Sequence, residues 1–147
     1  MIDRGSTPFG ESRLRVRYAE TDQMGLAYHS HYVVWCDIAR TELMRELGFP
    51  YRDLEREDGL FLTVTEVEIR YGAPAHYDDS IVVQVWIDSV QSRAITFSYV
   101  IRRDGDPSGR PLATARVKLV ATGRDGVPRT FPAHLRQRFR EVIQAKR

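Results

Sequence analysis

The chain has 147 residues, 42% of them hydrophobic and 29% charged, which predicts one globular domain whose core is large enough to need no disulfide or metal. The net charge of +2 gives no reason to expect a nucleic acid or a membrane surface as a partner. The first ten residues hold no apolar signal-peptide segment, and no apolar run reaches the ~20 residues of a membrane span. The single cysteine excludes an internal disulfide. We therefore expect a cytoplasmic protein.

The first predicted element is a strand that starts at Arg13, after a terminus (residues 1–11) that we expect to be flexible. Side chains alternate there between the basic Arg13, Arg15 and Arg17 and the mostly apolar Leu14, Val16 and Tyr18. A period of two predicts a half-buried strand with one solvated face.

A loop and a long helix follow this strand. Residues 21–29 break the alternation and contain Gly25, which favours a loop, and Ser30 can cap the helix after it. Residues 31–47 then carry a wide apolar stripe at helical spacing, made of Tyr32, Val33, Trp35, Cys36, Ala39, Leu43 and Leu47. Gly48 and Pro50 indicate the end of the helix.

Four further strands are predicted between residues 61 and 119, each with one apolar face. The four apolar sets are Phe61, Val67, Ile69 and Tyr71; Ile81, Val83, Val85 and Ile87; Ile95, Phe97, Tyr99 and Ile101; and Ala113, Ala115, Val117 and Leu119. Residues 90–93 and 104–110 are short, turn-rich connections that predict hairpins, and residues 132–145 predict a final amphipathic helix.

The apolar helix and the half-covered strands must bury their apolar faces against each other. We therefore expect an α+β protein in which an antiparallel five-stranded sheet wraps round the long helix, which is the hotdog fold.

The stretch from Tyr18 to Tyr32 combines the parts of an acyl-transfer site. Asp22 stands at the start of a glycine loop, and a helix N-terminus follows a few residues later. Unpaired N–H groups at a helix N-terminus can stabilise a developing oxyanion, while a carboxylate can act on water or on a carbonyl carbon. A loop aspartate on its own is more often a turn former or a cap than a catalyst, and Glu20 is the alternative carboxylate.

The same stretch carries a recognisable pattern, which continues further along the chain. It consists of Glu20, Asp22, Gly25, Tyr28-His29 and Ala39-Arg40-Thr41-Glu42, with a second segment at residues 69–75 followed by Tyr77, Asp78 and Asp79. This pattern resembles the 4-hydroxybenzoyl-CoA thioesterase family, especially its YbgC-like branch of acyl-CoA thioesterases. The resemblance extends from about Leu14 to Phe139 and implies that residues 1–147 form a single hotdog thioesterase domain.

The resemblance also implies a role for each matching residue of the site. Asp22 corresponds to the catalytic aspartate, either nucleophile or general base, and the backbone N–H of His29 corresponds to the donor that polarises the thioester carbonyl. Gly25 corresponds to the glycine that lets the loop pass close to the ligand. Arg93 falls where related enzymes place a basic residue near the CoA phosphates, with a merely solvated hairpin arginine as the alternative.

Several other side chains allow two interpretations. Tyr28 and Tyr32 either line an acyl pocket or simply pack. His29 and His31 form a His-x-His pair, but zinc needs three or four ligands, so we expect no metal, and the resemblance implies no cofactor. Cys36 lies in the middle of the helix without an obvious basic partner, which favours a buried structural cysteine over a nucleophile.

The expected function is hydrolysis of a small or medium acyl-CoA, although acyl carrier protein could replace CoA. One alternative is a hotdog hydratase or dehydratase, but such enzymes place a histidine and an acidic residue near the central helix, which here offers Asp37 and Glu42 without a suitable histidine. Another alternative is a non-catalytic acyl-thioester-binding protein. An open sheet edge predicts dimerisation, and the resemblance implies a homodimer or homotetramer with sites at the subunit interface.

Overall fold

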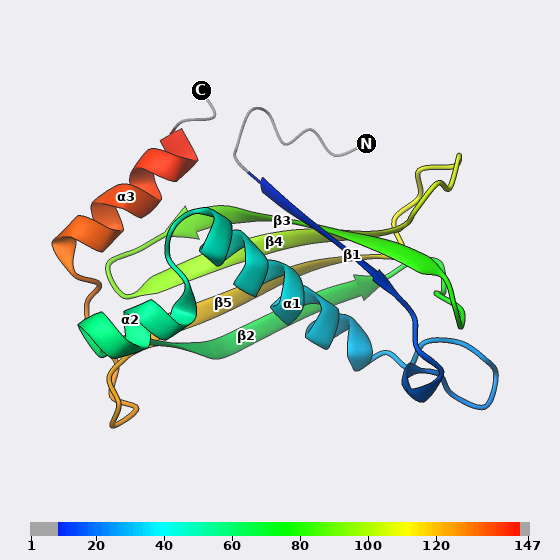
Figure 1. The fold of residues 1–147 in the computed structure, drawn as a ribbon, viewed down its shortest axis with the longest axis horizontal. Helices are drawn as coiled ribbons and strands as arrows, with labels where there is room; N and C mark the ends of the chain where they lie inside the picture. Colours follow the sequence, from blue (N-terminus) through cyan, green and yellow to red (C-terminus); the bar gives the residue numbers. More distant parts are fainter. Residues whose placement is uncertain (1–8, 145–147) are drawn as a thin grey trace.

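The computed structural model of the protein describes residues 9–144. Its elements follow the order β1 (Phe9–Arg15), a 3₁₀ helix (Tyr18–Glu20), α1 (His31–Glu46), α2 (Tyr51–Asp58), β2 (Phe61–Tyr71), β3 (Ser80–Val90), β4 (Ala94–Arg103), β5 (Ala113–Thr122) and α3 (Ala133–Gln144) (Figure 1). The part of the predicted flexible terminus before residue 9 lies outside the described residues. For residues 9–11 the prediction of a flexible terminus was wrong, because they pair with β3 as the first part of β1.

All five strands form one antiparallel sheet in the order β1-β3-β4-β5-β2. Helix α1 crosses one face of this sheet and packs mainly against β1 and β3 (Figure 1). Gly10 allows a close approach there, since a Cβ atom at this position would lie 3.3 Å from the Cβ of Leu43 on α1. The predicted antiparallel sheet with a long helix on one face is therefore confirmed.

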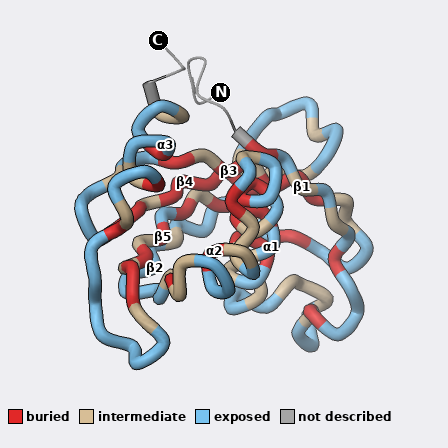
Figure 2. Tube along the Cα trace, turned by 60° about the vertical axis from the view of Figure 1, so that its left-hand side comes forward, coloured by how far each residue is buried: buried red, intermediate tan, exposed pale blue. Residues whose placement is uncertain are grey.

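The core lies between α1 and the three central strands. The alternating apolar residues predicted for β3, β4 and β5 are all buried, and adjacent strands place them side by side: Ile81, Val83, Val85, Ile87, Ile95, Phe97, Tyr99, Ile101, Ala113, Ala115, Val117 and Leu119. Buried positions accordingly gather on these strands and on the facing side of α1 (Figure 2).

The edge strand β2 departs from the predicted alternation. A shift in its pairing with β5 between Val64 and Glu66 marks a β-bulge, which inserts one extra residue and reverses the faces beyond it. The prediction that Phe61 shares a face with Val67 was therefore wrong. The α1 face of β2 is also poorly covered, because Val64 and Val67 remain 43% and 42% exposed.

Two helices complete the structure at the end of the sheet away from the β1–α1 loop (Figure 1). Helix α2 was not predicted, since Leu54 is its only buried residue and gives almost no apolar pattern. Helix α3 agrees with the prediction, and it buries Leu135 and Phe139. Within residues 9–144 no helix is long and apolar enough to cross a membrane.

Candidate active site

The segment that joins β1 to α1 forms two successive turns and is tied to the β2–β3 loop. Its bridges join Thr21 to Ala27 and Leu26 to His76. Tyr18, expected on the covered face of a strand, is instead exposed, because the strand ends at Arg15 and Tyr18 begins the 3₁₀ helix. These bridges give the loop a defined conformation beside the carboxyl end of β2.

Glu20 anchors the first turn. Its buried carboxylate accepts hydrogen bonds from the backbone N–H of Arg17 (2.8 Å) and from the indole N–H of Trp35 on α1 (3.0 Å). Its backbone carbonyl accepts the N–H of Tyr28 (2.8 Å). Burial alone raises the pKa of Glu20, but the hydrogen bonds from Arg17 and Trp35 outweigh it and hold the pKa below its ordinary value. Glu20 thus connects the loop to the helix.

Asp22 organises the second turn and remains exposed. Its Oδ1 accepts the backbone N–H groups of Met24 (2.8 Å) and Leu26 (3.2 Å), as in an Asx turn. Its Oδ2 has no hydrogen-bond partner among residues 9–144. One carboxylate oxygen therefore holds the loop, and the other is available to a ligand or to water.

Gly25 has a conformational role in this turn. Its φ of +76° lies in the left-handed region that favours glycine. A Cβ atom there would meet no atom within 4 Å, and the pocket described below does not include Gly25. The expectation that Gly25 lets the loop pass close to a ligand stays a prediction.

His29 lies just before the first turn of α1, with its side chain exposed. In the described part of the chain, neither its backbone N–H nor that of Ser30 has a hydrogen-bond acceptor. The carbonyl of His29 accepts the hydroxyl of Tyr71 at 2.9 Å. The predicted capping role of Ser30 was wrong, since Ser30 has helical backbone angles and its side chain makes no capping hydrogen bond. Two unpaired N–H groups thus remain at the positive end of the helix dipole.

A cavity of about 300 Å³ brings these groups together. It is lined by Asp22, Leu26, Ala27, Tyr28, His29, Tyr32, Tyr71, Gly72, Ala73 and Pro74. Four residues singled out in the sequence therefore share one pocket: Asp22, Tyr28, His29 and Tyr32. The volume falls at the small end of the range for pockets that bind small molecules.

The opposite wall of the pocket, residues 71–74, was not identified as part of the site from the sequence. Tyr71 is the last residue of β2, and Gly72 donates its N–H to the carbonyl of Leu112 (2.8 Å). A Cβ atom at Gly72 would lie 2.8 Å from the carbonyl oxygen of Pro111, so the close approach of these two segments requires glycine. The family-like pattern at residues 69–75 was the one sequence signal that could have located this wall.

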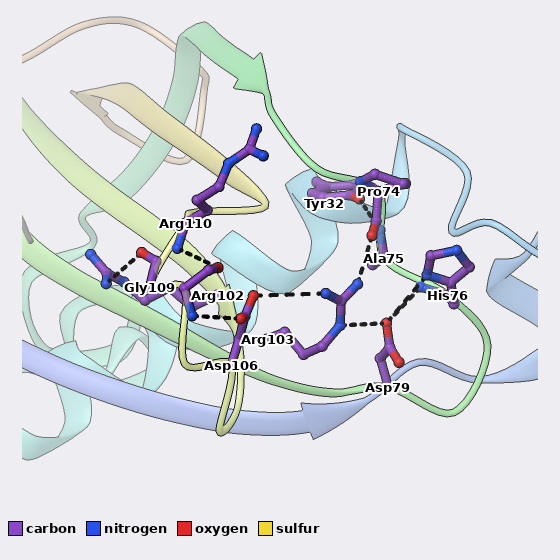
Figure 3. Close-up of polar contacts among 11 residues, drawn as sticks. Tyr32, Pro74, Ala75, His76, Asp79, Arg102, Arg103, Asp106, Gly109 and Arg110 are labelled. Carbon is purple, nitrogen blue, oxygen red and sulfur yellow. Dashed lines mark hydrogen bonds and ion pairs between the residues drawn. The ribbon is translucent and has the colours of Figure 1, made fainter.

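Arg103, from the end of β4, holds the same wall in place (Figure 3). Its guanidinium donates to the carbonyl of Pro74 (2.8 Å) and to Asp79 Oδ2 (3.1 Å). On the helix side, the hydroxyl of buried Tyr32 accepts the N–H of Ala75 (3.2 Å), as Figure 3 also shows. The β2–β3 loop is therefore fixed from two directions, and nothing in the spacing of Arg103 indicates its partners.

Arg93 does not join the pocket. It lies exposed in the β3–β4 hairpin, at the other end of the sheet from the β1–α1 loop (Figure 1). The predicted contact between Arg93 and CoA therefore has no support within a single chain.

Cys36 is buried in α1, as predicted for a structural cysteine. Burial raises the pKa of its thiol to about 12, so the thiol is protonated at neutral pH and is a poor nucleophile. Three or more histidine, cysteine or acidic residues do not come together anywhere in the described structure in a way that could hold a metal ion.

Comparison with known proteins identifies the family. Residues 16–139 match the sequence profile of the thioesterase-like superfamily, a range that contains every residue of the pocket. The chain belongs to the thioesterase-like superfamily. The expected class of enzyme, a thioesterase, is the class after which this superfamily is named.

Curated relatives extend this match. The chain is 31% identical over 143 residues to the acyl-CoA thioesterase YbgC of Haemophilus influenzae, covering 97% of this chain and 99% of that protein. It is 41% identical over 91 residues to the putative acyl-CoA thioesterase YneP of Bacillus subtilis. That match covers 62% of this chain and 65% of the relative, just under two thirds of its length.

Solved structures share the fold over nearly the whole chain. A hypothetical protein from Thermus thermophilus superposes with a TM-score of 0.82 at 29% identity, over 92% of this chain and 98% of that one. The DHNA-CoA thioesterase of Staphylococcus aureus gives a TM-score of 0.83 at 26% identity, over 93% and 91% of the two chains. The predicted family and hotdog fold are confirmed.

Proposed function

We propose that this member of the thioesterase-like superfamily hydrolyses acyl-CoA, with Asp22 as the catalytic carboxylate and the backbone N–H of His29 as the oxyanion donor. One observation carries the proposal: Asp22, whose Oδ2 is open, and His29, whose backbone N–H is unpaired, line the same cavity. The names of the relatives in Haemophilus and Bacillus support acyl-CoA as the substrate.

The proposed reaction begins with attack on the thioester carbonyl carbon. As a general base, Asp22 takes a proton from water, and the resulting hydroxide adds to that carbon. As a nucleophile, Asp22 adds directly and forms a mixed anhydride, which water then hydrolyses. In both routes the His29 N–H stabilises the oxyanion, the C–S bond breaks, and the CoA thiolate leaves and takes up a proton. The products are a carboxylic acid and free CoA.

The pocket walls favour a small or medium acyl group. A cavity of about 300 Å³ has room for a short aliphatic chain or one aromatic ring, and Tyr28 and Tyr32 are among the residues that line it. Tyr32 is buried and held through its hydroxyl by Ala75, so it forms a rigid floor. Tyr28, which also lines the pocket, is more exposed.

A second copy of the chain is the proposed partner. The β2 edge is unpaired in the described chain, and β2 carries the exposed apolar residues Val64 and Val67, while α1 carries the exposed Val34 and Ile38. Pairing between two copies would cover this edge and the neighbouring apolar side chains. Sedimentation velocity at assay concentrations should show a homodimer or homotetramer, and a monomer at all concentrations would contradict this.

The decisive experiment measures thiol release with a chromogenic disulfide over a panel of short, long, aromatic and hydroxylated acyl-CoAs. Wild-type protein should release CoA from at least one of them, and Asp22→Asn should lower kcat by about 10²–10⁴-fold, the range for loss of a general base. Asparagine keeps the acceptor oxygen for Met24 and Leu26, so the fold should survive.

Circular dichroism and thermal melting of Asp22→Asn provide the control for folding. A folded variant with wild-type turnover would rule out a catalytic role of Asp22. Failure of the wild-type protein to release CoA from any member of the panel would rule out acyl-CoA hydrolysis. After a single turnover in ¹⁸O-water, label in the carboxylate of Asp22 would identify the nucleophilic route, because a general base acquires none.

A further inference from the structure

Tyr71 makes a contact that the proposed reaction has not yet used. From the last position of β2, its hydroxyl donates a 2.9 Å hydrogen bond to the carbonyl of His29. Its ring lies edge-on to the ring of Tyr32, with centroids 5.1 Å apart, and edge-on to the imidazole of His29 at 6.3 Å. The edge strand of the sheet is therefore joined directly to the residue that carries the oxyanion donor.

This contact fixes one of the two peptide planes at His29. The N–H of His29 shares its plane with the carbonyl of Tyr28, which accepts the N–H of His31 (3.0 Å). The carbonyl of His29 shares the next plane with the N–H of Ser30, and Tyr71 holds that plane. The other hydrogen bond to this carbonyl comes from the N–H of Tyr32 and is much longer, at 3.4 Å.

We infer that Tyr71 is a positioning residue for hydrolysis: by holding the carbonyl of His29 it fixes the peptide plane that carries the N–H of Ser30, next to the plane of the His29 N–H, and so steadies the backbone around the oxyanion donor. The inference rests on the proposed function. Both planes at His29 are then held by hydrogen bonds, so the donors need not reorient as negative charge develops on the substrate oxygen.

The hydroxyl of Tyr71 is suited to this task over a wide range of pH. Burial raises its pKa above the ordinary value for tyrosine, so the group remains a donor under all assay conditions near neutrality. The ring lines the pocket, whereas the hydroxyl is directed to the protein backbone. Removing the hydroxyl alone therefore separates the positioning role from any contact between the ring and the acyl group.

The test compares Tyr71→Phe with Tyr77→Phe. Tyr77 is a matched control, since it is 55% exposed against 49% for Tyr71, lies outside the pocket, and its hydroxyl has no hydrogen bond within the described chain. Tyr71→Phe should lower kcat about five- to tenfold with KM changed by less than about twofold, as expected when one neutral hydrogen bond is lost from an interaction that matters mainly in the transition state. Tyr77→Phe should retain both values.

The outcomes separate the two proposals. Active wild-type protein together with a folded Tyr71→Phe variant of unchanged kcat would overturn the positioning role and leave the thioesterase function intact. A rise in KM at constant kcat, or an equal loss in Tyr77→Phe, would also overturn it. Wild-type protein that hydrolyses no acyl-CoA would overturn the proposed function and this inference with it.

Discussion

The two turns between β1 and α1 use their carboxylates in opposite ways. In the first turn, Glu20 is buried and its oxygens are occupied by Arg17 and Trp35. In the second turn, Asp22 is exposed and uses one oxygen for its own loop, leaving the other open. Two acidic residues so close in the sequence thus have separate tasks: a buried carboxylate with several donors fixes the backbone, and an exposed one beside unpaired N–H groups can act on a substrate.

The largest effect on stability should come from Glu20→Gln. Loss of the charge weakens the hydrogen bonds from Arg17 and Trp35 and places an amide N–H₂ near donors that need an acceptor. The free energy of unfolding should fall by about 2–3 kcal/mol, as expected for hydrogen bonds to a charged group. Urea denaturation followed by tryptophan fluorescence measures this.

Asp22→Asn is the matched comparison for Glu20→Gln. Its amide oxygen can still accept the N–H groups of Met24 and Leu26, so the free energy of unfolding should change by less than about 0.5 kcal/mol, as is usual for exposed substitutions. Equal losses of stability in the two variants would remove the distinction between the two turns.

Lowering the pH should reveal the contribution of ionised Glu20 to the stability of the wild-type protein. The folded-state pKa of Glu20 is lower than its ordinary value of 4.5, so the unfolded chain binds the proton more readily. The stabilisation by ionised Glu20 is complete well above pH 4.5 and is lost as the pH falls through the folded-state pKa. The free energy of unfolding, measured by denaturation between pH 7 and pH 3, should therefore fall less steeply with decreasing pH in Glu20→Gln than in the wild-type protein. Identical slopes in wild type and variant would contradict this account.

Gly25→Ala tests the geometry of the second turn. Alanine at φ +76° should cost about 1–2 kcal/mol, although a Cβ atom meets nothing there. Gly105 has the same φ and equally open surroundings in the β4–β5 loop, so Gly105→Ala should lose similar stability. Only Gly25→Ala should also lower kcat, because its turn contains Asp22; equal kcat in both variants would show that the turn tolerates distortion.

The sequence predicted those parts of the fold whose signal is local. Strands β3, β4 and β5 each carry an unbroken apolar period that burial followed, and most of the apolar stripe predicted for helix α1 is also buried. The bulge after Val64 could not be anticipated, because one extra residue changes the face of a side chain without changing the composition. Helix α2 was missed because it is only eight residues long and mostly charged, and Leu54 is its one buried residue.

The candidate site also has one part that a local sequence pattern predicts and another part that it does not. Asp22 and His29 were found because they lie in one short stretch with a familiar pattern. Tyr71 and Arg103 reach their partners from distant strands, and no local spacing specifies that a strand-end tyrosine will bind the carbonyl before a helix. Arg93 was placed by analogy alone, and it lies at the far end of the sheet.

The buried Cys36 makes this protein unusually convenient to assay. Its thiol is enclosed in α1 and remains protonated, so the folded protein should not react with the chromogenic disulfide that reports released CoA. Background colour from the catalyst itself should then be absent. Once the chain unfolds, one thiol per molecule becomes reactive, so a single reagent can record turnover in the native protein and the rate of unfolding in denaturant.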